Sequence, residues 1–77
     1  MVRIVLAELT EELARYRYYP EDSGDYGVVA LNRQNGNRIY ETQAEGYGQT
    51  YAAHALKRIE EYQKIGDFPK EDIVAWY

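Results

Sequence analysis

The side chains that most often carry out chemistry are scarce in this chain. His54 is its only histidine, Ser23 is its only serine, and cysteine is absent. A Ser-His-acid arrangement would need Ser23 and His54 to meet beside a carboxylate, and their positions give no reason for this. A boundary residue that makes an ordinary hydrogen bond is the simpler role for His54. The sequence therefore predicts no catalytic residue, no metal ligand and no cofactor, and we expect a protein that is not an enzyme.

Three carboxylates, Glu21, Asp22 and Asp25, form the densest acidic group. Oxygen-rich loops can bind calcium, but the spacing lacks the Asp-x-Asp-x-Asp-Gly run and the closing glutamate of an EF-hand. The simplest interpretation is a solvated turn whose side chains accept hydrogen bonds from nearby amides. If the chain binds another protein, the candidate contacts are these carboxylates and the loop tyrosines Tyr26 and Tyr47.

Arginine and tyrosine alternate in the segment that precedes this acidic group. Such interleaving supplies the ingredients of a stacking platform for single-stranded nucleic acid. On a strand, Arg15, Arg17 and Tyr19 would share one face, and Tyr16 and Tyr18 the other. The simpler interpretation places the second pair in the core and lets the arginine stems cover the outside of the sheet.

Charge and composition limit the classes of partner. Thirteen acidic residues against nine basic ones give a formal charge of −4, which makes duplex DNA and anionic lipid poor partners. The first apolar run is too short for a signal peptide or a membrane span. The absence of cysteine suits a reducing compartment, so we expect a cytoplasmic protein with no membrane association. Nine tyrosines are the unusual feature, because their amphipathic rings suit sheet faces and protein interfaces.

The length of the chain predicts a single domain over residues 1–77, since two halves of it would be too short to bury a core without disulfides or metals. A domain of this size buries only about 60% of the surface that its unfolded chain exposes. Its stability should be modest, and formation of a homodimer would add to it.

The clearest element is an amphipathic helix from about Thr50 to Ile65. Thr50 is a candidate N-cap, and Gly66, followed by Pro69, predicts a helix end with the glycine in the left-handed conformation. One stripe at helical spacing is apolar, and we expect it to face the core. Its members are Tyr51, Ala52, Ala55, Leu56, Ile59 and Tyr62.

A hairpin is predicted at Asn35-Gly36, because Asn-Gly between two alternating strands favours a tight turn. The length of its loop decides the register. With two or four loop residues, Tyr40 shares a face with Val29 and Leu31; with three, Ile39 takes its place.

Residues 2–17 allow two interpretations. A hairpin explains the β-branched residues and the alternation of arginine and tyrosine, and it would place Glu8 opposite Arg15 and Val5 opposite Tyr18. A helix would instead use the apolar residues that recur at intervals of three or four. We favour the hairpin and keep the helix as the alternative.

The chain is expected to close with a strand over residues 73–77, after a polar connector at residues 70–72. This strand ends in two aromatic residues. An exposed Trp-Tyr pair would be a liability for a monomer, so we expect Trp76 to pack on the core.

Several segments together form a wider pattern, which comprises Tyr18 through Gly27, His54 through Tyr62, Gly66, Phe68-Pro69 and Val74 through Tyr77. In this pattern the chain resembles a family of small uncharacterised proteins from Gram-positive bacteria. The similarity covers nearly the whole chain from Tyr16 onward. The resemblance implies a bacterial, cytoplasmic origin and carries no activity, cofactor or substrate with it.

These elements predict an α+β fold in the order β-β-β-β-α-β. Two hairpins and a C-terminal strand form a small antiparallel sheet, and one amphipathic helix packs on one face. Richness in tyrosine and the lack of catalytic residues favour a small module that binds another protein as a regulator or inhibitor. The alternative function is single-stranded nucleic-acid binding through Arg15, Arg17 and Tyr19.

Overall fold

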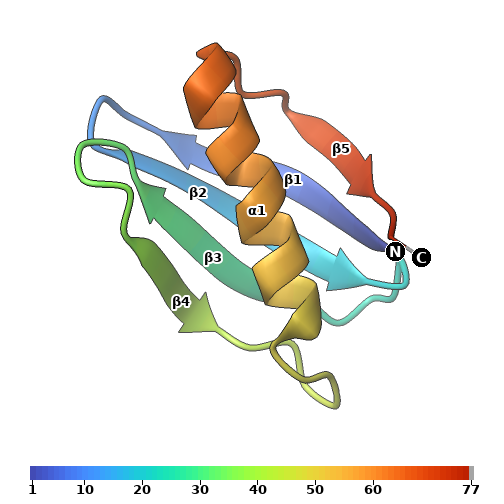
Figure 1. Cartoon of the computed structure of the whole chain (residues 1–77). Helices are drawn as coiled ribbons and strands as arrows, with labels where there is room; N and C mark the ends of the chain where they lie inside the picture. The colour runs from blue at the N-terminus through green and yellow to red at the C-terminus, as the bar shows by residue number, and fades with distance from the viewer. Residues whose placement is uncertain (77) are drawn as a thin grey trace.

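The computed structural model describes residues 1–76 and confirms the predicted α+β fold. In chain order the elements are β1 (Val2–Leu9), β2 (Leu13–Pro20), β3 (Gly27–Asn32), β4 (Arg38–Thr42), α1 (Thr50–Ile65) and β5 (Glu71–Val74). The strands form one antiparallel sheet in the order β4-β3-β2-β1-β5. The helix crosses one face of this sheet, and no other element covers the opposite face in the part of the chain described (Figure 1).

The first segment is a hairpin, as the favoured interpretation predicted, and not a helix. Along β2, Ala14, Tyr16 and Tyr18 are buried, and the residues between them are exposed or half-buried. This period of two matches a strand with one face on a core, whereas a helix would bury every third or fourth residue.

The register of this hairpin matches the prediction at one end only. Glu8 lies opposite Arg15 as predicted, but Val5 lies opposite Arg17 and not opposite Tyr18. The ladder shifts between Leu6 and Glu8, where β1 carries one extra residue. Such a bulge changes the pairing of every residue on its far side, and the sequence gives no signal for it.

The second hairpin has a loop of four residues. The amide of Asn32 donates to the carbonyl of Asn37 at 2.9 Å and so closes the loop. Within the loop, two amides donate to the side chain of Asn32, and Gly36 has a φ of 79°. Tyr40 therefore lies opposite Val29, on the helix side of the sheet.

The helix has the predicted bounds, but its first turn differs in one detail. Gln49 is the N-cap, not Thr50, and no side chain caps this end by a hydrogen bond. The reason is that Gln49 already has helical backbone angles, φ −77° and ψ −7°. Within residues 1–76 no helix is long and apolar enough to cross a membrane.

The other end of the helix confirms the prediction for Gly66. Its φ is 85°, and its amide donates to the carbonyl of Tyr62 at 2.7 Å. This conformation is open to glycine and costs other residues energy, because a Cβ atom crowds the neighbouring carbonyl.

We expect Gly66→Ala to lower the free energy of unfolding by about 1 kcal/mol in urea denaturation. Gly48→Ala is the matched control, because a Cβ at Gly48 meets nothing within 4 Å and its φ lies outside the left-handed region. The Gly48 variant should change stability little. Equal losses in the two variants would contradict the role of backbone conformation at Gly66.

One core joins the sheet to the helix. The helix contributes the predicted stripe. All of its residues are buried except Tyr51, which is half-buried. The buried members of the core are Val2, Ile4, Ala14, Tyr16, Tyr18, Val29, Leu31, Ala44, Ala52, Ala55, Leu56, Ile59, Tyr62 and Val74.

Two buried tyrosines of β2 tie this core to the loops at the two ends of the helix. The hydroxyl of Tyr16 donates to the carbonyl of Pro69 at 2.7 Å, and burial raises the pKa of Tyr16 to about 12. The hydroxyl of Tyr18 accepts a hydrogen bond from the amide of Ala44 at 3.0 Å. Both hydroxyls therefore have a partner, which removes most of the cost of burying them.

The last strand begins and ends earlier than predicted, and Ala75 and Trp76 lie beyond its end. β5 runs from Glu71 to Val74 and pairs with β1. Trp76 follows it and packs on the core as expected, with its ring stacked on His54 at a centroid distance of 3.9 Å. Tyr77, the end of the predicted strand, lies outside the described residues.

The prediction of a polar connector at residues 70–72 is wrong for two of its three residues. Glu71 and Asp72 belong to the strand because each carboxylate faces a cation. Arg3 lies 3.6 Å from Glu71, and Arg58 lies 2.9 Å from Asp72. Tertiary contacts here outweigh the low strand propensity of acidic residues.

Candidate protein-interaction site

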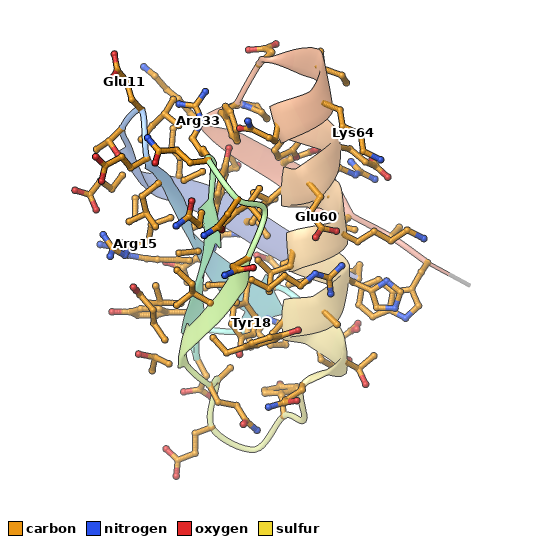
Figure 2. The ribbon with its side chains drawn as sticks, turned by 60° about the vertical axis from the view of Figure 1, so that its left-hand side comes forward. Glu11, Arg15, Tyr18, Arg33, Glu60 and Lys64 are labelled. Atoms are coloured by element: carbon orange, nitrogen blue, oxygen red, sulfur yellow. The ribbon has the colours of Figure 1, made fainter. Side chains whose placement is uncertain are left out.

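The sheet face turned away from α1 carries the arginines and one tyrosine of β2. Arg15, Arg17 and Tyr19 alternate with buried residues along this strand. Figure 2 shows Arg15 on the far side of the sheet from the helix and Tyr18 on the helix side. The grouping that strand periodicity predicted for these side chains is therefore present.

Arg15 lies on the central strand of the sheet and is bonded to acids of two other strands. Its guanidinium donates to both carboxylate oxygens of Glu41, at 2.8 and 2.9 Å, and also to Glu8. These hydrogen bonds from Arg15 hold the pKa of Glu41 below its usual value. A guanidinium engaged in this way has few donors left for a phosphate or for a partner's carboxylate.

Arg3 belongs to the same face, although the sequence did not suggest it as a site residue. Its guanidinium lies 4.2 Å from the centre of the Tyr19 ring. It also donates to Asp22 at 2.7 Å and lies near Glu71. The alternation of Val2, Arg3 and Ile4 was the available signal, because a strand period places Arg3 opposite the core.

Arg17 differs from these two arginines. It is exposed and has no ion pair with any residue from 1 to 76. Its guanidinium lies 5.4 Å from the centre of the Tyr26 ring, which is 46% exposed and lies 5.4 Å from the Tyr19 ring. We call Arg17, Tyr19 and Tyr26 the Arg17 patch; it offers an unpaired cation on a surface of two aromatic rings.

Two of the three carboxylates in the acidic loop have a structural role. Glu21 and Asp22 have positive φ angles of 50° and 57°. Glu21 accepts hydrogen bonds from the Met1 amine and the Tyr51 hydroxyl, at 2.8 and 2.9 Å, which lower the pKa of Glu21. Asp22 is engaged by Arg3, as described above. Asp25 is exposed and has no ion pair among the described residues.

The remaining residues singled out in the sequence do not join the Arg17 patch. Tyr47 packs against the core with its ring edge-on to Tyr51, at a centroid distance of 5.4 Å. Ser23 donates its hydroxyl to the carbonyl of Asp25 at 3.1 Å. His54 stacks on Trp76. Ser23 and His54 therefore have separate roles in the fold.

The space beside His54 is small. A cavity of about 160 Å³ is lined by residues of α1, the end of β5 and the chain that follows it, including His54 and Trp76. Sites for small molecules usually measure about 300–1,000 Å³. Within residues 1–76, no group of three or more histidine, aspartate or glutamate residues is arranged to hold a metal ion.

Comparison with known proteins adds no family to these observations. No protein-family model, no curated protein and no solved structure matches the chain. The resemblance to small proteins of Gram-positive bacteria therefore stays a prediction. The geometry of the surface is the basis for the functional proposal that follows.

Proposed function

We propose that this chain is a small, non-enzymatic protein-interaction module of the bacterial cytoplasm, and that it contacts its partner through the Arg17 patch. The supporting observation is the unpaired guanidinium of Arg17 beside the exposed ring of Tyr26. Arginine and tyrosine are enriched at the centres of protein interfaces, where a flat ring and a fork of donors bind strongly. The expected partner surface presents a carboxylate to Arg17 and apolar groups to the two rings.

The charges of this face favour protein over single-stranded nucleic acid. A nucleic-acid groove combines stacking rings with several cations that neutralise phosphates. Here Arg3 and Arg15 are paired with acids of the same face, which leaves Arg17 alone. The alternative function would therefore have rings for stacking but little charge to hold the backbone.

Site-specific photocrosslinking tests the proposal in the cells that make the protein. A benzophenone amino acid at Tyr26 should give a protease-sensitive adduct, and Arg17→Glu should abolish most of it, because the partner's carboxylate would meet a negative charge. Leu9 is the matched control position. It is 44% exposed and pairs with buried Ala14, which places it toward the helix face.

Each other outcome has a definite meaning. An adduct of equal strength at Leu9, or one at Tyr26 that survives Arg17→Glu, would refute a specific role for the Arg17 patch. An adduct removed by nuclease and not by protease would support the nucleic-acid alternative. A crosslinked species of twice the chain's mass would identify the partner as a second copy.

A further inference from the structure

A second surface lies on the opposite face of the sheet, along strand β4. This strand is at one edge of the sheet, next to β3 only. Four of its five residues are exposed, and Tyr40 is 46% exposed. An edge strand of this kind presents unpaired backbone groups to solvent and can accept a further strand.

The hydrogen bond between Asn32 and Asn37 fixes which backbone groups are available. In an antiparallel pair, residues that exchange hydrogen bonds alternate with residues whose amides and carbonyls point outward. Asn32 and Asn37 are bonded to each other, so Ile39 also directs its backbone toward β3. Arg38 and Tyr40 therefore direct their amide and carbonyl groups toward the free edge.

A groove runs beside this edge, between α1 and the β3–β4 hairpin. At one end is a cavity of about 330 Å³ lined by Leu31, Gly36, Glu60, Gln63 and Lys64. At the other end is a cavity of about 250 Å³ whose lining includes Tyr18, Tyr40, Thr42, Gln49 and Ala52. Between the two, Arg38 donates to both carboxylate oxygens of Glu60, at 2.7 and 3.0 Å, and links the strand to the helix.

The charge of the groove is opposite in sign to that of the whole chain. The net charge of the chain is −4, yet the helix side of the groove carries Lys57 and Lys64, which form no ion pair within residues 1–76. The charges of Arg38 and Glu60 cancel each other, and the charge of Glu41, which also lines the groove, is cancelled by Arg15. The groove therefore has an excess of positive charge and would favour an acidic ligand.

We propose that this groove binds an extended acidic-apolar peptide of a partner protein, which adds to β4 as a sixth strand. Its backbone pairs with the outward groups of Arg38 and Tyr40. Alternate side chains point toward the helix, and residues four apart in a strand lie about 13 Å from each other. The two cavities lie near the two ends of β4, one at Gly36 and the other at Thr42. The expected pattern is therefore apolar-x-acidic-x-apolar, with an apolar side chain in each cavity and the acid near the lysines.

The probe for this proposal is the synthetic peptide Gly-Ser-Leu-Thr-Glu-Thr-Leu-Ser-Gly, carrying a fluorescein label, with the full-length protein. We expect binding by fluorescence anisotropy, and NMR shifts confined to the amides of β4 and the groove side of α1. Replacement of the central glutamate of the peptide by lysine should weaken binding at least about tenfold, because the acid then becomes a like charge.

Two further measurements separate strand addition from simple charge attraction. Lys57→Glu combined with Lys64→Glu should weaken binding about tenfold, whereas Lys70→Glu, an exposed lysine beside β5, should not. Two N-methylated peptides, each blocking a different set of alternate amides, should differ, because only one set faces β4. Folding of every variant is checked by the NMR spectrum.

The proposal is overturned by any of three results. One is no binding at millimolar peptide, and another is equal binding of the two N-methylated peptides. The third is NMR shifts of the β4 amides that depend on protein concentration without peptide, which would show that a second copy occupies the edge. Because the Arg17 patch lies on the other sheet face, loss of either surface leaves the test of the other intact.

Discussion

Gly27→Ala is expected to lower the free energy of unfolding by about 2–4 kcal/mol, measured by urea denaturation. A Cβ atom at Gly27 would lie 2.3 Å from the ring carbons of Tyr18 and 2.4 Å from its hydroxyl oxygen. The ring is 1% exposed and accepts a hydrogen bond from the amide of Ala44. It therefore has no space to move without opening the core or losing this bond. For a small domain, such a loss is a large part of the total stability.

Two controls isolate the contact between Gly27 and the ring. Gly24→Ala adds the same methyl group where nothing lies within 4 Å, and it should change stability little. Tyr18→Leu removes the obstructing atoms at its own cost, so the alanine at position 27 should cost less in that background. If the alanine costs the same with and without the tyrosine ring, the ring is not the obstacle.

Gly27 also shows which strand boundaries local sequence patterns do not predict. Proline and glycine are typical of connectors, yet Pro20 ends β2 and Gly27 begins β3. A glycine reads as a chain breaker when only its own backbone is considered. Its place in the strand follows from Tyr18, which lies directly opposite and covers it. Cross-strand contacts of this kind depend on register, which local patterns leave open.

The candidate site shows the same division between local and tertiary information. Strand period was enough to place Arg15, Arg17 and Tyr19 on one face, because alternation is a local property. Which of these arginines is neutralised depends on neighbours brought by other strands. Glu41 reaches Arg15 from β4, two strands away in the sheet. That contact depends on the order of the strands in the sheet.

The acidic residues of β5 were also missed by local patterns, for a different reason. The pairing of β5 with β1 at the edge of the sheet joins residues from opposite ends of the chain. Nothing local to Glu71 and Asp72 indicates a strand. Arg3 of β1 faces Glu71, and the helix presents Arg58 and Tyr62 to the carboxylate of Asp72. An acidic residue whose carboxylate accepts hydrogen bonds from two residues of another element can therefore lie in a strand.

Asp72→Asn is accordingly expected to cost about 2 kcal/mol at neutral pH. The carboxylate accepts hydrogen bonds from the Tyr62 hydroxyl and, at 2.9 Å, from Arg58. The backbone amide of Ile73 donates to it at 2.8 Å. An amide side chain keeps one acceptor oxygen and replaces the other by a donor, so at least one of these N–H or O–H groups loses its acceptor and meets a second donor.

The acid dependence of stability provides the sharper test of this carboxylate. Burial alone would raise the pKa of Asp72, but the hydrogen bonds from Tyr62, the Ile73 amide and Arg58 outweigh it and lower this pKa. A lowered folded-state pKa stabilises the fold above the unfolded value of about 3.9. That contribution is lost as the pH falls from there through the folded-state pKa, so the stability difference between wild type and Asp72→Asn should shrink in acid.

Urea denaturation of both proteins at a series of pH values from neutral to strongly acidic measures this difference directly. Asp25→Asn is the control, because Asp25 is exposed and has no ion pair within the part of the chain described; its difference from wild type should stay near zero throughout. A difference for Asp72→Asn that persists unchanged in strong acid would mean that shape, not charge, explains the loss. A difference that disappears would show that one ionised carboxylate holds the edge strand to the helix.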